Sequence, residues 1–320
     1  MKIILLLPIL GFAVGTLWAQ DAPAPEPAAP AAPADPAPAA PAAAEPAAAE
    51  EVSEARWSDF LPLNKEMAGD ADLPLPFGIG VVILNQKQDM LTDSISVTAI
   101  NPIVAAIDVA EVIGNPADPT VSTTLSMTAD RVESDVDAKL IRLDAWVLPF
   151  LNVYGIAGSV EGDNKVINAT HTSAAVTAAM ANFPAITYEG DVLGIGGILA
   201  FARNNWWVTL DYSYTEADLT ISTSEIITKT FTPRIGTVGE LGDLSGTIWI
   251  GGMQQKVDEH QIGTAPFPPA TVDYDVMQHA REEWNFLVGA SVNLSEELNV
   301  AMEAGFGDRE QFMGTLTLRF

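Results

Sequence analysis

The chain has no cysteine, only three histidines, and 15 basic residues against 42 acidic ones. Without cysteine it can form no disulfide, and it cannot carry the lipid anchor of a bacterial lipoprotein, which requires a cysteine at the cleavage site. The formal net charge of −27 argues against a nucleic-acid partner, because phosphate contacts require Lys and Arg. Stability must come from another source, and closing a sheet into a barrel suffices because it pairs every strand edge.

The first 19 residues have the composition of a secretory signal peptide. Met1 and Lys2 precede the apolar run Ile3–Val14, and Ala19 is the expected cleavage position. A membrane-spanning helix is the alternative, but the run is shorter than the about 20 residues that a span needs. After this segment no run of about 18 apolar residues occurs, which excludes helical spans. We therefore expect an exported protein.

From residue 73 onward, apolar and polar residues alternate with the period of two that is typical of β-strands. In the last nine residues, one face of the strand contains Phe312, Gly314, Leu316, Leu318 and Phe320. This ending resembles the final strand of bacterial outer-membrane β-barrels. A soluble sandwich would alternate as well, but strand lengths of about 9–11 residues, aromatic strand ends and the signal peptide favour a barrel.

The connections test the barrel independently, because outer-membrane barrels have short periplasmic turns and longer outer loops. Counting back from the C-terminus, the pattern predicts strands at 312–320, 298–307, 283–295, 245–256, 225–237, 206–218, 190–203, 149–160 and 137–146. The turns 295–297, 238–244, 204–205 and 147–148 are then all short and periplasmic. The two longest connections, 161–189 and 257–282, both fall outside, as the rule demands.

Before residue 137 the pattern is less clear, and it predicts further strands at 77–86, 93–101, 104–113 and 119–131. All of these together would give an odd number, which single-chain bacterial barrels avoid. We therefore expect a bend at Pro102 rather than a turn. The prediction is an all-β fold, a transmembrane antiparallel up-and-down barrel of about 12 strands in residues 73–320, with 10 or 14 strands as alternatives.

The segment between the signal peptide and the barrel has two parts. Residues 20–51 are almost entirely Ala, Pro and acidic residues, so we expect a disordered, extended linker there. Residues 52–72 contain Trp57 and Phe60 and predict either a periplasmic tail or a short helix at the barrel entrance or within the lumen.

Charged residues on the strands are expected to face the lumen, because Arg or Lys facing lipid near the midplane costs about 2–4 kcal/mol. Alternation places six candidate lumen-lining residues inward: Arg142, Asp144, Asp211, Arg234, Glu303 and Arg319. They form either a structural ion-pair network that fills a small barrel or a constriction that screens small solutes.

Aromatic residues gather near the expected strand ends, where Trp and Tyr contact both lipid tails and water. They are Trp146, Phe150, Tyr154, Trp206, Trp207, Tyr212, Tyr214, Trp249, Trp284 and Phe320. We interpret them as membrane-interface residues rather than as a sugar-stacking surface.

The outer loops offer little chemistry. An Ala-rich stretch at 173–183 predicts a helix that either covers the barrel or folds into its lumen. The carboxylates of loop 257–282 match no calcium-binding spacing, so we expect a solvated acidic loop and no metal or cofactor site.

Catalysis has weak support. The histidines His171, His260 and His279 all fall in expected outer loops. His171 lies close to Ser173 in sequence, but a nucleophile and its base must meet in space. We therefore expect no enzyme activity.

The block from Arg142 to Gly158, RLDAWVLPFLNVYGIAG, resembles uncharacterised proteobacterial outer-membrane proteins. With the terminal Phe320 it implies a barrel in the bacterial outer membrane, with the linker and the C-terminus in the periplasm. Outer-membrane lipids, lipopolysaccharide and, through the C-terminal strand, the barrel assembly machinery are the expected partners. The resemblance covers residues 73–320 and brings no established activity.

Three functions remain open on the sequence. The first is a porin-like channel for small hydrophilic solutes or ions. The second is a closed structural or surface-recognition barrel with acidic outer loops. The third, with the least support, is a lipid-modifying enzyme. The sequence does not indicate the oligomeric state.

Overall fold

The computed structural model describes residues 61–68, 74–100, 122–181, 183–220, 224–241, 244–267 and 270–320. The expected signal peptide, the linker 20–51 and the expected strand 104–113 lie outside these residues. All described residues belong to one unit, Glu54–Phe320. Among them, no helix has the length and apolar character needed to cross a membrane.

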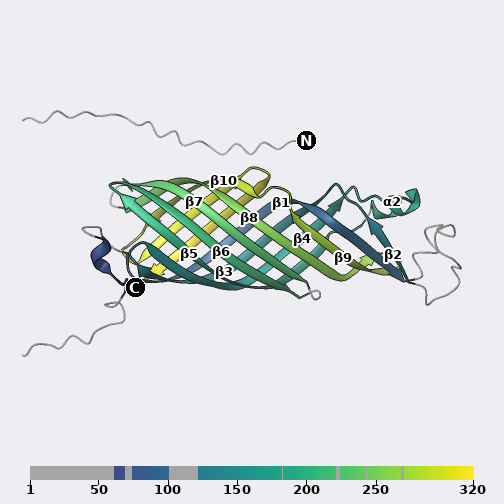
Figure 1. Cartoon of the computed structure of the whole chain (residues 1–320), viewed down its shortest axis with the longest axis horizontal. Coiled ribbons are helices and arrows are strands. Elements are labelled where there is room, and N and C mark those ends of the chain that lie inside the picture. Colours follow the sequence, from purple (N-terminus) through teal and green to yellow (C-terminus); the bar gives the residue numbers. More distant parts are fainter. Residues whose placement is uncertain are drawn as a thin grey trace, which may run out of the picture. The chain divides into compact units, whose positions relative to one another are not determined.

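The described part of the chain forms one antiparallel sheet of twelve strands that closes on itself (Figure 1). The strands are β1 (Phe77–Ile100), β2 (Ser122–Met127), β3 (Arg131–Leu148), β4 (Leu151–Ile167), β5 (Ile186–Arg203), β6 (Trp206–Leu219), β7 (Glu225–Leu241), β8 (Leu244–Phe267), β9 (Ala270–Ala280), β10 (Trp284–Asn293), β11 (Leu298–Phe306) and β12 (Arg309–Arg319). Two short helices, η2 (Lys65–Ala68) and α2 (Ala174–Met180), complete the described elements. The expected all-β antiparallel barrel of about twelve strands is confirmed.

The sheet closes twice along its length. In the part that contains the C-terminus, the ring consists of β1, β3 to β8 and β10 to β12, because β10 pairs with β8 and β12 pairs with β1. Farther along, β9 pairs with both β8 and β1, and the ring there consists of β1 and β3 to β9. We call the end with Phe320 the turn end and the end with α2 the loop end (Figure 1).

The ring narrows from ten strands to eight because β9 and β10 act as one interrupted strand. Both pair antiparallel with β8, and the chain steps sideways between them at residues 281–283. On the turn-end side of this step, the β11–β12 hairpin lies between β10 and β1 and pairs with both. The hairpin turns at Gly307, whose φ of 142° requires a glycine. On the loop-end side of Gly307, β9 pairs with β1.

Two expectations about the strands are wrong. Residues 257–282, expected as an outer loop, form the end of β8 and the whole of β9. Segments 77–86 and 93–101, expected as two strands, form the single strand β1. In both places the outward face becomes polar, as at Lys87 and Asp258. The apolar–polar contrast of a membrane strand is lost there, although the hydrogen-bond ladder continues.

Short connections gather at the turn end, as the sequence predicts. Residues 149–150, 204–205 and 294–297 make three of these connections, and β7 and β8 are paired up to Leu241 and Leu244. At the loop end, α2 lies between β4 and β5, which confirms a helix in the Ala-rich stretch 173–183. The expected outer loop 161–189 is shorter than predicted, because β4 and β5 extend into it.

Outward-facing side chains near the turn end form an apolar belt on the ten strands of the wider ring. Its large exposed members include Ile79, Ile83, Ile141, Leu143, Val153, Leu193, Ile195, Trp206, Tyr212, Ile235, Ile250, Trp284, Phe286, Met302, Phe312 and Phe320. Toward the loop end the outward positions turn charged, and Lys87 pairs with Asp135 across β1 and β3. The barrel wall therefore continues well beyond its apolar part.

Inside the ring, aromatic side chains lie over glycines of neighbouring strands. Tyr154 covers Gly196, and a Cβ on Gly196 would collide with the Tyr154 ring. Trp249 covers Gly289 in the same way. Gly197 faces outward, and a Cβ there would have its nearest neighbour, the Asn152 backbone oxygen, at 3.5 Å. The register of β4 against β5 thus depends on the absence of a side chain at Gly196.

A single methyl group at Gly196 tests this packing. We expect Gly196→Ala to lower the free energy of unfolding by about 1–3 kcal/mol, because the rigid Tyr154 ring must move. Gly197→Ala, one residue along the same strand, is the control and should change stability little. Urea unfolding of the refolded barrel measures both. Equal effects of the two variants would contradict the register.

Candidate functional site

The six charged residues expected in the lumen all lie on the inner face of the ring. They come from β3, β6, β7, β11 and β12: Arg142, Asp144, Asp211, Arg234, Glu303 and Arg319. On β3 they alternate with Ile141 and Leu143, which are more than half exposed on the outer face. The period of two therefore separates a charged inner face from an apolar outer face.

The centre of this arrangement is the pair Arg234 and Glu303. Arg234 Nε donates to Glu303 Oε2 at 2.6 Å, and Arg234 Nη2 donates to Oε1 at 2.8 Å. Trp249 Nε1 donates a further hydrogen bond to Oε2 at 2.7 Å. Glu303 is 1% exposed, so its charge is compensated almost entirely by these three donors. The bidentate hydrogen bonding between Arg234 and Glu303 fixes the orientation of both side chains.

From Arg234 the contacts continue across the lumen to β6, β4 and β3. Arg234 Nη1 lies 3.6 Å from Asp211 Oδ2. The Tyr154 hydroxyl donates to Asp211 Oδ1 at 2.7 Å. The guanidinium of Arg142 lies over the Tyr154 ring, 3.9 Å from its centroid. This cation–π contact adds an attraction that needs no carboxylate.

The last contacts bring the chain of interactions to β12. Arg142 Nη2 donates to Asn152 Oδ1 at 3.1 Å, and Asn152 Nδ2 donates to Asp144 Oδ1 at 2.6 Å. Arg319 Nη2 donates to the same Asp144 oxygen at 3.0 Å. We call the connected set the charge network: Arg142, Asp144, Asn152, Tyr154, Asp211, Arg234, Trp249, Glu303 and Arg319. It ties together strands that are not neighbours in the sheet.

Some aromatic residues lie elsewhere than expected. Trp206, Tyr212, Trp284 and Phe320 are exposed on the outer face, in the apolar belt. Tyr214 also faces outward, by its alternation with Tyr212, and is half-buried. In contrast, the Nε1 of Trp146 is buried.

Tyr154, Trp207 and Trp249, expected at the membrane interface, lie inside the ring. Trp207 and Trp249 are in contact, with their ring centroids 5.9 Å apart. The sequence did carry a signal for this placement: Tyr154 shares its parity with the polar Asn152, and Trp249 with Thr247.

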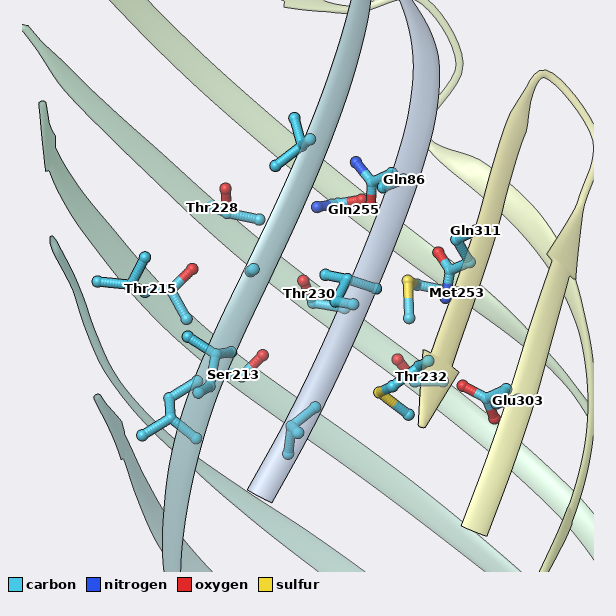
Figure 2. A pocket seen from close by; sticks show the side chains of 18 of the residues that line it. Gln86, Ser213, Thr215, Thr228, Thr230, Thr232, Met253, Gln255, Glu303 and Gln311 are labelled. Atoms are coloured by element: carbon cyan, nitrogen blue, oxygen red, sulfur yellow. The ribbon is translucent and has the colours of Figure 1, made fainter. Parts of the chain in front are cut away.

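Inside the wider ring lies a cavity of about 420 Å³ with two unlike walls (Figure 2). One wall is apolar and includes Val82, Leu84, Leu140, Ile156, Val160 and Val192. The other wall carries hydroxyl and amide groups, including Ser213, Thr215, Thr228, Thr230, Thr232 and Gln255. Figure 2 shows Thr228, Thr230 and Thr232 in a row along β7. The cavity is therefore amphipathic.

Toward the loop end, apolar side chains fill the narrower ring. One cluster consists of Met90, Val132, Val257 and Ala280. A second cluster lies farther toward the loop end, where β2 and not β3 pairs with β1, and consists of Ile95, Val97, Met127, Val176, Ile186, Val272, Tyr274 and Val276. Its member Val176 belongs to α2 and is 1% exposed, so the helix packs onto the interior of the barrel. An eight-stranded ring is just wide enough for its own side chains to fill.

Glu259 is a buried carboxyl group at the loop-end side of the cavity. It lies beyond the apolar belt, since its outward neighbours on β8 are Asp258 and His260. Asn164 Nδ2 donates to its Oε1 at 2.9 Å, and Gln261 Nε2 donates at 2.6 Å. Burial raises the pKa of Glu259, which favours the neutral carboxylic acid.

Arg309 is a buried guanidinium at the step between β9 and β10. It is 1% exposed, and its Nη2 lies 3.4 Å from the Met253 oxygen and 3.5 Å from the Glu283 oxygen. These are backbone carbonyls at the place where the β8 ladder changes partner. Arg309 thus supplies donors where the sheet is interrupted.

The histidines contact groups other than a nucleophile. His171 Nδ1 accepts a hydrogen bond from the Ser173 backbone amide at 3.0 Å. His260 Nε2 lies 2.9 Å from Asp275 Oδ1, and His279 Nδ1 lies 3.1 Å from Asp93 Oδ2. Both pairs are on the exposed outer face of the barrel wall beyond the apolar belt, where they link neighbouring strands.

No protein-family model and no curated protein sequence matches this chain. Among solved structures, it is similar to the transport unit of the autotransporter AIDA-I from Escherichia coli, with 7% identity, a TM-score of 0.36, and coverage of 77% of this chain and 90% of that one. It is also similar to LpxR from Salmonella typhimurium, with 11% identity, a TM-score of 0.30, and coverage of 74% and 100%.

A third similar structure is the CymD monoaromatic hydrocarbon channel, with 10% identity, a TM-score of 0.27, and coverage of 82% of this chain and 93% of that one. Likenesses of this size carry no argument about what this chain does. The fold itself follows from the strand pairing described above.

Removing the charge of Glu303 tests the energetic role of the charge network. We expect Glu303→Gln to destabilise the barrel by about 3 kcal/mol or more, because Arg234 loses its buried partner. Glu161→Gln is the matched control: Glu161 pairs with Lys139 at 3.2 Å with both side chains mostly exposed, and such pairs contribute about 0–1 kcal/mol. Urea unfolding measures both variants. Similar losses would show that the buried pair has no special weight.

Proposed function

We propose that this chain is a β-barrel of the bacterial outer membrane whose lumen is closed toward the loop end. In this proposal it acts as a structural or surface-recognition barrel and not as an open pore for hydrophilic solutes. The apolar belt supports the membrane location, because an outward band of exposed aliphatic and aromatic side chains suits lipid and not water.

The observation that carries the closed lumen is the apolar filling of the narrower ring. A hydrated solute on the axis would have to displace buried side chains such as Met90, which is 0% exposed, and Val132, which is 1% exposed. Hydrophobic constrictions of this kind exclude water and ions. Nearer the turn end, the charge network narrows the lumen without filling it, because the cavity lining continues past Glu303 to Asn299 and Thr317.

The orientation in this proposal follows from the connections. Short turns lie on the periplasmic side of outer-membrane barrels, so the turn end and Phe320 would face the periplasm. The C-terminal strand would then be the part that the barrel assembly machinery recognises. The loop end would project outward from the cell.

The extension beyond the belt is the part available for surface contacts. Its outward positions on adjacent strands are mainly acidic, including Asp135, Asp137, Glu161, Asp163 and Glu189. At the cell surface these groups would face lipopolysaccharide, where divalent cations bridge anionic groups. The proposal assigns no catalytic role, and the histidine–carboxylate pairs serve to link strands of this extension.

A channel is the second candidate, and the cavity is the observation that favours it. An internal space of about 420 Å³ with a charged margin is what a gated pathway would need. A channel function requires that the apolar clusters of the narrower ring separate.

The membrane location predicts a position-dependent cost for an outward charge. We expect Ile195→Arg, in the apolar belt of β5, to destabilise the barrel in phospholipid vesicles by about 2–4 kcal/mol. Thr187→Arg, outward on the same strand beyond the belt, should change stability by less than about 0.5 kcal/mol. Equally small changes in stability in the two variants would contradict the membrane location.

Planar-bilayer recording separates the closed barrel from the channel. We expect the folded wild-type protein to insert without stable open steps, and Glu303→Ala to remain silent as well. Insertion is verified by flotation with vesicles, and folding by different migration of boiled and unboiled samples on gels. Stable steps whose ion selectivity changes in Glu303→Ala would establish the channel instead.

A further inference from the structure

We propose that the internal cavity binds an uncharged amphipathic molecule, one with an apolar part and a part that carries hydroxyl groups. This inference goes beyond the closed barrel, and it depends on the lining of the cavity and not on whether the barrel conducts.

The two walls of the cavity require different partners. A volume of about 420 Å³ is within the range of about 300–1,000 Å³ that is typical of small-molecule sites. Water alone would suit the hydroxyl wall of β6 and β7, but it gains nothing from the aliphatic wall of β1, β3 and β4, since apolar cavities tend to stay empty. A molecule with one face of each kind satisfies both walls.

The lining of the cavity also contains buried amide groups that lack a partner among the described atoms. Gln311 is 6% exposed, and both its Oε1 and its Nε2 are unpaired. Gln255 is 9% exposed, and its Oε1 is unpaired. The Oε1 of Gln88 is also unpaired, and all three residues line the cavity. Leaving such groups unpaired costs about 1–3 kcal/mol each. Hydroxyl groups suit them because a hydroxyl both donates and accepts.

The charged groups of the lining already have partners within the barrel. Arg142 donates to Asn152, lies over the Tyr154 ring, and has Asp144 Oδ2 at 3.9 Å from its Nε. Arg234 is bonded to Glu303, and Asp211 accepts from Tyr154 and lies near Arg234. Glu259 already accepts hydrogen bonds from Asn164 and Gln261. The unpaired cation Arg309 is outside the lining and points toward backbone carbonyls. A charged ligand would therefore bury its charge without a counter-ion, which is strongly unfavourable.

The lining also indicates the direction of approach. It continues past Glu303 toward the turn end along small or medium-sized residues of β11 and β12, namely Ala301, Asn299, Thr315 and Thr317. The register places Ala301 opposite Thr315 and Asn299 opposite Thr317. In the opposite direction, the apolar clusters of the narrower ring block the axis. The molecule therefore enters beside the charge network, from the turn end.

The experiment uses three probes that share an eight-carbon chain and differ in the head: octane-1,2-diol, octanoate and octylammonium. Each is titrated into the full-length protein in lipid nanodiscs, and separately included during refolding, with protein-free nanodiscs as the partition blank. We expect the diol to bind saturably at one per barrel, and at least tenfold more tightly than either ion.

Three substitutions locate the site. Thr230→Val and Gln255→Leu each remove a hydrogen-bonding group from the polar wall at nearly constant volume, and each should weaken diol binding about tenfold. Gln254→Leu is the matched control on the same strand: Gln254 faces outward, where it donates to Glu283 at 2.6 Å, and its loss should leave binding unchanged. Gel mobility before and after boiling confirms that each variant is folded, and Thr228→Val replaces any variant that is not.

The outcomes are exclusive. No saturable diol binding in either sample, or equal binding in the wild type and both wall variants, would show that the cavity holds only water, and the proposal fails. Tighter binding of octanoate or octylammonium would refute the uncharged class. Because bilayer conductance is not part of this measurement, its result stands whether the barrel proves closed or conducting.

Discussion

Completeness of the backbone hydrogen-bond ladder is the constraint on which the rest of this structure depends. In the bilayer core an unpaired backbone N–H or C=O group cannot form a hydrogen bond with water, so a membrane-spanning sheet must close. This chain closes at two circumferences, and the two strands of 24 residues, β1 and β8, belong to both rings. Along β1 the partner changes from β12 to β9, and along β8 it changes from β10 to β9. Each change replaces one set of bonds by another, so the edge that β1 and β8 present to these partners stays paired across the change.

The contents of the lumen follow from the two circumferences. Where ten strands surround it, side chains of ordinary size cannot reach the axis, and the space is divided between long charged residues and a cavity. Where eight strands surround it, aliphatic residues meet and pack. Charged groups are tolerated in the wider part because they compensate one another, as Arg234 and Glu303 do. Geometry thus decides which chemistry each level of the barrel can hold.

The sequence was informative where an energetic penalty acts on single positions. Charges such as Arg142 and Glu303 could be assigned to the interior because lipid would reject them, and strand ranges within the belt followed from alternation. It was uninformative where the outward face meets water, as at Asp258 and His260, because a polar face there resembles a loop. Partners within the charge network also escaped, since Arg234 and Glu303 lie 69 residues apart and only the closed ring brings them together. The inward placement of Tyr154 could have been predicted from the alternation of the strand, because Tyr154 is two residues from the polar Asn152. We expected it at the membrane interface because it is aromatic.

The β11–β12 hairpin acts as an inserted pair of strands whose height is fixed by its turn at Gly307. On the turn-end side of Gly307 the ring includes β11 and β12. On the loop-end side β1 pairs with β9, beginning at Met90 and Ala280. If β11 and β12 were each two residues longer at this turn, they would have to separate β9 from β1, which would expose the interior of the narrower ring. The length of two adjacent strands therefore sets how deep the hollow of the barrel can run, and insertions or deletions at this one turn would make relatives with a deeper or a shallower chamber from otherwise unchanged walls.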